Sequence, residues 1–133
     1  MDKDLIQRKA TQIEHSVARI NEKLPANLNA FVNDFDAQDI IYRNFQIAVQ
    51  NAVDIGSHII ATQRLAAPKS MGDVFTQLTT HRLISSKMGK ELRDMVTVRN
   101  IIVHDYTRID HKKVFRHLKK AIKTVTQFSL RFI

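Results

Sequence analysis

Residues 98–106, with the sequence VRNIIVHDY, carry the side chains best suited to chemistry. Arg99 and His104 lie five positions apart, on either side of the apolar triplet at residues 101–103. An arginine can hold a phosphate group through two parallel hydrogen bonds and stabilise the charge that develops on it. A histidine can transfer protons near neutral pH. Arg99 and His104 together are therefore suited to phosphodiester chemistry.

The spacing of this pair leaves its role open. On an ideal helix, Arg99 and His104 would be separated by about 140° around the axis and about 7.5 Å along it. Their side chains would then flank a ligand, or line a cleft at the end of the helix, rather than touch each other. A histidine at a helix C-terminus also commonly serves only to cap that helix. From the residues alone, catalysis and capping both remain as interpretations.

Composition and motifs exclude several other kinds of site. The chain has 133 residues and no cysteine, which rules out disulfides, thiol nucleophiles, iron–sulfur clusters and cysteine-based zinc sites. None of its six histidines belongs to an HExxH motif, and there is no Walker loop and no GxGxxG or GxSxG motif. The sequence therefore predicts no metal site and no cofactor, and acid–base chemistry remains.

The elements that must position the Arg99–His104 pair are helices. Apolar residues recur with a helical period along nearly the whole chain, and three glycines and two prolines are too few for a turn-rich β fold. Helices are expected over about residues 5–24, 37–64, 70–79, 86–104 and 110–131. Residues 27–33 fit either a short helix or an irregular connection. The sequence thus predicts one all-α domain over residues 1–133, a helical bundle of four main helices plus short helical pieces.

Helix breakers and capping residues mark several boundaries. Pro25 ends the first helix, and Pro68 lies in a loop. Ser70 followed by Asp73 resembles a capping box at the start of a short helix, although Glu or Gln is more usual in the second position. Asp110 is a suitable N-cap for the last helix.

The helix expected over residues 37–64 has apolar residues at too many positions for one narrow stripe. We therefore expect it at the centre of the bundle, or in contact on two sides. Gly56 lies inside this helix, where a glycine costs roughly 1 kcal/mol relative to alanine. Either another backbone approaches closely at Gly56, or the position simply tolerates a small residue.

The net charge of +8 and an isoelectric point near 10.1 indicate a polyanionic partner, such as nucleic acid, an acidic protein or an anionic membrane. Residues 99–133 hold nine basic and two acidic residues, so this end carries +7 of the charge. Six basic residues fall on one side of the expected last helix. They form a basic stripe of Lys112, Lys113, Arg116, Lys119, Lys120 and Lys123. This stripe is either a solvated surface or a track for a polyanion.

No targeting or membrane segment is evident. The N-terminus has no apolar signal core, and no part of the chain approaches 18 uninterrupted apolar residues. A soluble, cytoplasmic protein without membrane contact is therefore expected.

The motif Arg99-x4-His104-x-Tyr106 resembles the RX4HXY motif of the HepT-like toxins, a branch of the HEPN superfamily. The similarity is not confined to this motif. The other similar segments are residues 43–61, 68–75 and 109–110. The likeness covers most of the chain, from about residue 5 to residue 132.

This resemblance implies both a fold and an activity. HepT-like proteins are ribonuclease toxins of bacterial and archaeal toxin–antitoxin pairs, and their antitoxin is a minimal nucleotidyltransferase. They are α-helical bundles that work as homodimers with two motifs in one cleft, and their cleavage of RNA is regarded as metal-independent. Carried over by position, Arg99 and His104 would be the catalytic pair of an RNA endonuclease. By analogy with other metal-independent ribonucleases, His104 would act as general base or acid and Arg99 would stabilise the phosphorane. We infer that two copies of His104 in the dimer would divide the two proton-transfer roles.

The resemblance also implies roles for neighbouring residues. The antitoxin of this family can transfer AMP onto the motif tyrosine, here Tyr106, and so block the ribonuclease. The alternative for Tyr106 is a half-buried ring with a satisfied hydroxyl. From their positions in the sequence, we expect Asn100 either to bind substrate or to cap the helix end, and Asp54, on the long helix, to pair with Arg99 and hold its guanidinium in place. The basic stripe would bind RNA.

Two other functions are compatible with the sequence. One is a non-catalytic HEPN module that binds a nucleotidyltransferase partner, a nucleotide or nucleic acid without cutting RNA. The other is a basic helical protein that binds nucleic acid through salt-dependent electrostatics. The presence of both Arg99 and His104 favours the ribonuclease.

Overall fold

The computed structural model describes residues 2–133, which form six α-helices and one 3₁₀ turn and contain no β-strand. The elements are α1 (Lys3–Lys23), α2 (Leu28–Asn33), α3 (Phe35–Thr62), α4 (Met71–Thr80), α5 (Ser86–His104), η1 (Tyr106–Arg108) and α6 (His111–Arg131). The predicted all-α bundle is confirmed, with α1, α3, α5 and α6 as its four long helices. The short helix is the correct interpretation of residues 27–33. No helix within residues 2–133 is long and apolar enough to cross a membrane.

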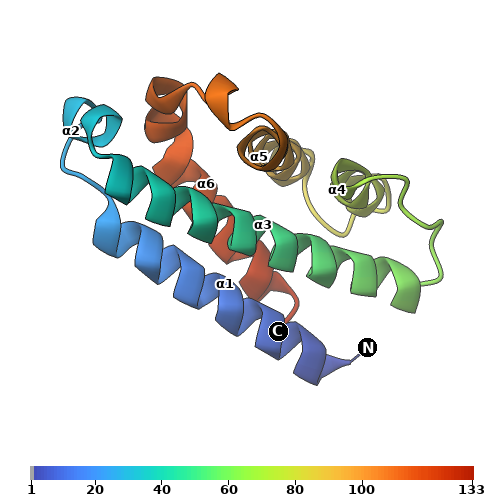
Figure 1. Ribbon diagram of the computed structural model, residues 1–133. Coiled ribbons are helices and arrows are strands. Elements are labelled where there is room, and N and C mark those ends of the chain that lie inside the picture. Colours follow the sequence, from blue (N-terminus) through green and yellow to red (C-terminus); the bar gives the residue numbers. More distant parts are fainter. Residues whose placement is uncertain (1) are drawn as a thin grey trace.

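Helix α3 lies at the centre of the bundle (Figure 1). It contacts α1, α2, α4, α5 and α6, and 14 of its 28 residues are buried. Helix α1 runs beside α3 in the opposite direction, and α6 packs against both of them. The predicted central position of this helix is therefore confirmed, and it follows from the apolar residues on more than one side of α3.

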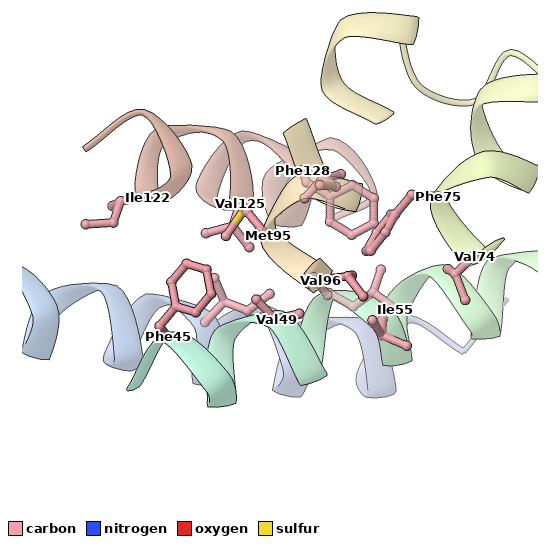
Figure 2. Packing of buried hydrophobic residues seen from close by; sticks show 14 of the residues in the cluster. Phe45, Val49, Ile55, Val74, Phe75, Met95, Val96, Ile122, Val125 and Phe128 are labelled. Atoms are coloured by element: carbon pink, nitrogen blue, oxygen red, sulfur yellow. The ribbon is translucent and has the colours of Figure 1, made fainter. Parts of the chain in front are cut away.

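Figure 2 shows the part of the core in which α3, α4, α5 and α6 meet. Phe75 of α4 and Phe128 of α6 pack edge to face, with their ring centroids 5.6 Å apart. Phe45 and Val49 reach the same cluster from α3, and Met95 reaches it from α5. Burying an apolar side chain of this size contributes about 1.5–3 kcal/mol. The core thus fixes α5 on α3, and α5 carries Arg99 and His104 near its C-terminal end.

Helices α3 and α4 approach each other closely at Gly56. A Cβ atom at this position would lie 2.5 Å from Val74 Cγ1 and 3.3 Å from Leu78 Cδ1. The first distance is far below a van der Waals contact, and a β-branched valine has few rotamers into which it can retreat. Gly56 therefore does more than tolerate a small residue, but the atoms that approach it belong to side chains of α4 and not, as one interpretation expected, to another backbone.

Every α-helix begins at a side chain that accepts a hydrogen bond from a free amide of the first turn. The capping residues are Asp2, Asn27, Asp34, Ser70, Ser85 and Asp110. The predicted caps Ser70 and Asp110 are thus confirmed. The reciprocal half of the capping box is displaced by one residue, because Asp73 accepts from the amide of Lys69 rather than from that of Ser70.

Helices α3 and α4 both end with an arginine in the left-handed conformation. The φ angle is 57° at Arg64 and 60° at Arg82. In both cases the next amide donates to the carbonyl five residues earlier, which is the Schellman pattern. Glycine normally occupies the left-handed position of this pattern, and no glycine follows directly after either helix. The sequence placed these ends near residues 64 and 79, close to the observed ends at Thr62 and Thr80, but it did not predict the left-handed arginines.

Candidate functional site

The candidate site lies where α5 ends and the chain turns through η1 into α6 (Figure 1). Helix α5 ends at His104, and the amide of Asp105 makes its last backbone hydrogen bond, at 2.9 Å. The carbonyl of Asp105 then accepts from the amide of Arg108 at 2.9 Å, which closes the turn of η1. Asp110 starts α6 by accepting from the first-turn amide of Lys113 at 3.1 Å. Two aspartates therefore fix the path of the chain just after the Arg99–His104 pair.

Arg99 lies on the side of α5 that faces the bundle, because Met95, Val96 and Ile102, each one turn away, are all buried. Arg99 itself is half-buried, and its Nη1 donates to Asn100 Oδ1 at 3.1 Å. Its Nε is buried and has no hydrogen-bond partner within residues 2–133. An unpaired buried donor costs about 1–3 kcal/mol. An anion that reached this nitrogen would therefore be bound favourably.

His104 is exposed at the last position of α5. It lies about 140° around the helix axis from Arg99, so the two side chains leave α5 in different directions. Val103 lies between them around the axis, and this apolar residue is 39% exposed. The predicted pair therefore flanks a surface strip, as its spacing suggested, and does not converge on one point within the chain.

The two residues expected to support Arg99 occupy different positions. Asn100 accepts the hydrogen bond from Arg99, whereas α5 ends four residues later, so Asn100 does not cap this helix. Asp54 accepts instead from Lys9 Nζ at 2.9 Å and from Gln50 Nε2 at 3.0 Å. Within residues 2–133 no ion pair joins Asp54 to Arg99, and that prediction is wrong. The reason is that Asp54 lies on the side of α3 turned toward α1, whereas Arg99 lies on α5.

Tyr106 of η1 turns back onto α3. Its hydroxyl donates to Asp39 Oδ1 at 3.1 Å, and its ring packs edge to face on Tyr42, with the centroids 6.0 Å apart. Asp39 and Tyr42 lie three residues apart on one turn of α3, so both of them contact the side chain of Tyr106. Tyr106 remains 44% exposed, so a second molecule can reach it.

Tyr42 anchors this end of the bundle. It is 2% exposed, its Oη lies 2.6 Å from His111 Nδ1, and the two rings stack with their centroids 5.6 Å apart. Phe31 of α2 packs against Tyr42 and also against Phe115 of α6. This aromatic cluster holds α2, α3 and the start of α6 together beneath η1.

The electrostatics of the site keep both tyrosines protonated. Burial, together with the hydrogen bond and the charge of Asp39, raises the pKa of Tyr106 above its ordinary value of 10.0. Burial is also the main cause that raises the pKa of Tyr42, and the charges of Tyr106 and Asp110 add to it. At neutral pH the Tyr106 hydroxyl is therefore a donor whose proton already lies in a hydrogen bond to Asp39.

All six residues of the basic stripe on α6 are exposed. Lys120 lies 3.4 Å from Glu91 of α5, and the same carboxylate accepts a hydrogen bond from Thr124. The bond from Thr124 and the charge of Lys120 lower the pKa of Glu91, so this ionised group joins α5 to α6. The other five members of the stripe form no ion pair in the described part of the chain. Their positive charge is therefore available to a partner.

Sequence reasoning did not identify Asp39 and Tyr42 as residues of this site. Asp39 and Tyr106 are 67 residues apart in the chain, and no motif links them. The only signal was an acid and an aromatic residue on one turn of a helix, which is too common a pattern to single out. Their role became visible only when η1 was placed against α3.

The site presents a guanidinium, an imidazole and a phenol hydroxyl from Arg99, His104 and Tyr106. Within residues 2–133, no three His, Cys, Asp or Glu side chains are grouped so that they could hold a metal ion. An all-α bundle that carries the motif Arg99-x4-His104-x-Tyr106 at the end of α5 agrees with the resemblance to the HEPN class of ribonuclease toxins. Residues 13–132 match the family described as Ribonuclease HepT-like, and the chain belongs to this family.

Comparisons with individual proteins agree with this assignment. The chain is 32% identical over 125 residues to the mRNA nuclease HepT of Shewanella oneidensis, covering 94% of this chain and 93% of that protein. It is 26% identical over 97 residues to the tRNA nuclease HepT of Aphanizomenon flos-aquae, covering 73% and 66%. A solved structure of the tri-AMPylated Shewanella oneidensis HEPN toxin in complex with MNT antitoxin matches with a TM-score of 0.90 and 30% identity, covering 99% of this chain and 98% of that one. The HEPN-type fold is thereby confirmed.

Proposed function

We propose that this chain is the toxin of a toxin–antitoxin pair and cleaves RNA as an endonuclease, with Arg99 and His104 as its catalytic pair. One observation carries the proposal: a half-buried guanidinium with a buried Nε that has no partner within residues 2–133 lies five residues before an exposed imidazole at the end of the same helix. Membership of the Ribonuclease HepT-like family supports it. So do the names of the two relatives, an mRNA nuclease and a tRNA nuclease. Because its substrate would be cellular RNA, we assign the protein to the cytoplasm.

In the proposed reaction, the RNA 2′-oxygen forms a bond to the adjacent phosphorus, and the bond from phosphorus to the 5′-oxygen of the next nucleotide breaks. His104 takes the proton of the 2′-hydroxyl or gives a proton to the leaving 5′-oxygen. Arg99 holds the non-bridging oxygens through two hydrogen bonds and stabilises the charge that they gain in the transition state. Both roles are filled by side chains, without a metal ion or a cofactor.

The proposed working unit is a homodimer. A single chain offers one imidazole for two proton transfers, and its Arg99 and His104 point in different directions. A second copy facing the first would supply another His104, so that one imidazole serves as base and the other as acid. Val103 supports this arrangement, because an apolar residue that is 39% exposed between the two catalytic side chains is suited to an interface.

The proposed partner is a minimal nucleotidyltransferase antitoxin that transfers AMP to Tyr106. The similar Shewanella oneidensis toxin is tri-AMPylated and in complex with MNT antitoxin. In this chain Tyr106 is 44% exposed and lies two residues after His104. An AMP group on its hydroxyl would place a bulky anion where the RNA phosphate must bind.

The basic stripe is the proposed binding surface for the rest of the RNA. It begins at Lys112, in the first turn of α6 and directly after the site. Five of its six charges have no ion-pair partner in the described part of the chain. Phosphate groups are attracted to such a surface without regard to base sequence.

The test is cleavage of total RNA by the purified chain, without its partner and in EDTA. Wild type should cleave, whereas Arg99→Ala and His104→Ala should each lower the rate by about 10²-fold or more. Lys90→Ala is the matched control, because Lys90 is a cation on the same helix and is paired with Asp94 on an exposed surface. Sedimentation equilibrium of the wild type should give about twice the chain mass of 15.3 kDa. Cleavage that persists in both variants at the site would refute the proposal.

A further inference from the structure

Asp39 makes a contact that the ribonuclease reaction does not use. Its Oδ1 accepts the hydrogen bond of the Tyr106 hydroxyl at 3.1 Å, and within residues 2–133 this carboxylate has no other hydrogen-bond or ion-pair partner. The Tyr106 ring is held at the same time by the edge of Tyr42. Asp39 is exposed, and Tyr106 is 44% exposed, so the contact lies at the surface and is open to a second protein.

The transfer of AMP to a tyrosine requires an acceptor for one proton. The phenol oxygen forms a bond to the α-phosphorus of ATP, the bond from that phosphorus to the bridging oxygen of the β-phosphate breaks, and pyrophosphate leaves with the electron pair. The hydroxyl proton must leave the phenol oxygen during this step. Burial and Asp39 raise the pKa of Tyr106, so the hydroxyl arrives at the reaction still protonated.

We propose that Asp39 of the toxin takes the proton from the Tyr106 hydroxyl when a nucleotidyltransferase transfers AMP to it. This role rests on the proposed modification of Tyr106. Asp39 Oδ1 is the atom that already holds this proton in a hydrogen bond, so no rearrangement of the chain is needed before transfer. After the transfer, the protonated carboxyl passes the proton to water. The toxin thus contributes a catalytic residue to its own modification.

The local structure favours this role over that of a simple anchor for η1. The path of η1 is already fixed by Asp105 and Asp110 through backbone amides, and the start of α6 is held by the pair of Tyr42 and His111. The bond to Asp39 also cannot survive modification, because the ester oxygen has no hydrogen and the new phosphate group is an anion like the carboxylate. The contact therefore belongs to the state that precedes transfer.

The experiment follows AMP addition by intact mass, using purified toxin, its partner nucleotidyltransferase and ATP. In single-turnover measurements, Asp39→Asn should slow the transfer by about 10²-fold, while the ATP concentration that gives half of the maximal rate stays unchanged. Asp39→Glu should recover a substantial part of the rate. The matched control is Asp36→Asn, which removes an exposed carboxylate from the same helix, and it should react as wild type does. Wild-type rates in Asp39→Asn would overturn the proposal.

A second measurement separates proton transfer from mere positioning of the ring. A fluorinated tyrosine inserted at position 106 loses its proton more readily than tyrosine does. In the Asp39→Asn variant, the fluorinated tyrosine should therefore restore most of the lost rate of transfer. In toxin that retains Asp39, the same replacement should change the rate little. Absence of this rescue would overturn the role of Asp39 as proton acceptor. The wild-type measurement tests the modification itself. If the wild-type toxin gained no AMP from a partner shown to be active on ATP, both the proposed modification of Tyr106 and this inference would be refuted.

Discussion

At the scale of single residues, Tyr42 determines how the surface residues of the site are held. It is buried on α3, hydrogen-bonded to His111 and in contact with the ring of Tyr106. One side chain thereby connects the core helix to the start of α6 and to the tyrosine that we propose is modified. The hydroxyl must stay protonated for this, because a buried phenolate would be poorly solvated.

Tyr42→Phe should lower the free energy of unfolding by about 1 kcal/mol at neutral pH, because the hydrogen bond to His111 is lost. The free energy of unfolding of the variant should also fall less than that of the wild type as the pH rises above about 10. Burial raises the pKa of Tyr42 above 10.0, so the unfolded chain releases this proton first as the pH rises. Below about pH 10 the stabilisation is fully present, and above it the wild type should lose up to about 1.4 kcal/mol per pH unit through this group.

Urea denaturation of both proteins between neutral pH and about pH 11 measures this difference. The lysines are common to the two proteins, so their titration cancels in the comparison, and the effect of Tyr42 remains. Parallel curves for wild type and variant above pH 10 would contradict the assignment.

At the scale of elements, the spacing of α3 and α4 depends on a glycine. Gly56 faces Val74 and Leu78, and an added methyl group would lie 2.5 Å from the valine. Gly72, in the first turn of α4, would place a Cβ atom with nothing within 4 Å. The two glycines of these helices therefore differ in the space around them while sharing helical backbone conformations.

Gly56→Ala should destabilise the protein by about 1 kcal/mol, because overpacking of about 1–3 kcal/mol exceeds the gain of roughly 1 kcal/mol in helix propensity. Gly72→Ala should have the opposite sign and add about 0.5 kcal/mol, since it reduces the freedom of the unfolded chain without a clash. Thermal denaturation of both variants beside wild type checks the pair. A stabilised Gly56→Ala protein would show that α3 and α4 can separate at no cost.

At the scale of the whole molecule, charge is distributed unevenly. The last 35 residues carry +7 of the net +8, and the exposed side of α6 presents most of this charge as the basic stripe. Glu91 neutralises only Lys120 within the described residues. The molecule therefore presents a strongly positive surface on α6 that begins eight residues after His104 in the chain. This is the arrangement expected of a protein that binds RNA through its phosphates.

Lys119→Ala combined with Lys123→Ala should weaken RNA binding and flatten its salt dependence. Each lost contact to single-stranded RNA should reduce the slope of log affinity against log salt by about 0.7. The His104→Ala background keeps the RNA intact, so that affinity is measured by fluorescence anisotropy at several salt concentrations. Lys69→Ala removes an exposed lysine from the loop before α4 and should leave the slope unchanged. An unchanged slope in the double variant would exclude these two lysines from the interface.

Much of the fold was predictable because helices depend on interactions within a few residues. Apolar periodicity, Pro25 and the caps Ser70 and Asp110 placed the helices close to their observed bounds. The left-handed conformation of Arg64 and Arg82 at two of the helix ends was not predictable, because glycine normally occupies such positions. The motif residues Arg99, His104 and Tyr106 were also identifiable, because all three lie within eight consecutive positions.

Only the tertiary structure decided which side chains of different helices contact each other. Asp54 pairs with Lys9 rather than with Arg99, and Asp39 receives Tyr106 from 67 residues away. Such contacts depend on the rotation and position of whole helices, which are set by the combined packing of the core. Periodicity identifies the buried face of a helix but not its neighbours, so the sequence could identify the motif and only the packed bundle could show what surrounds it.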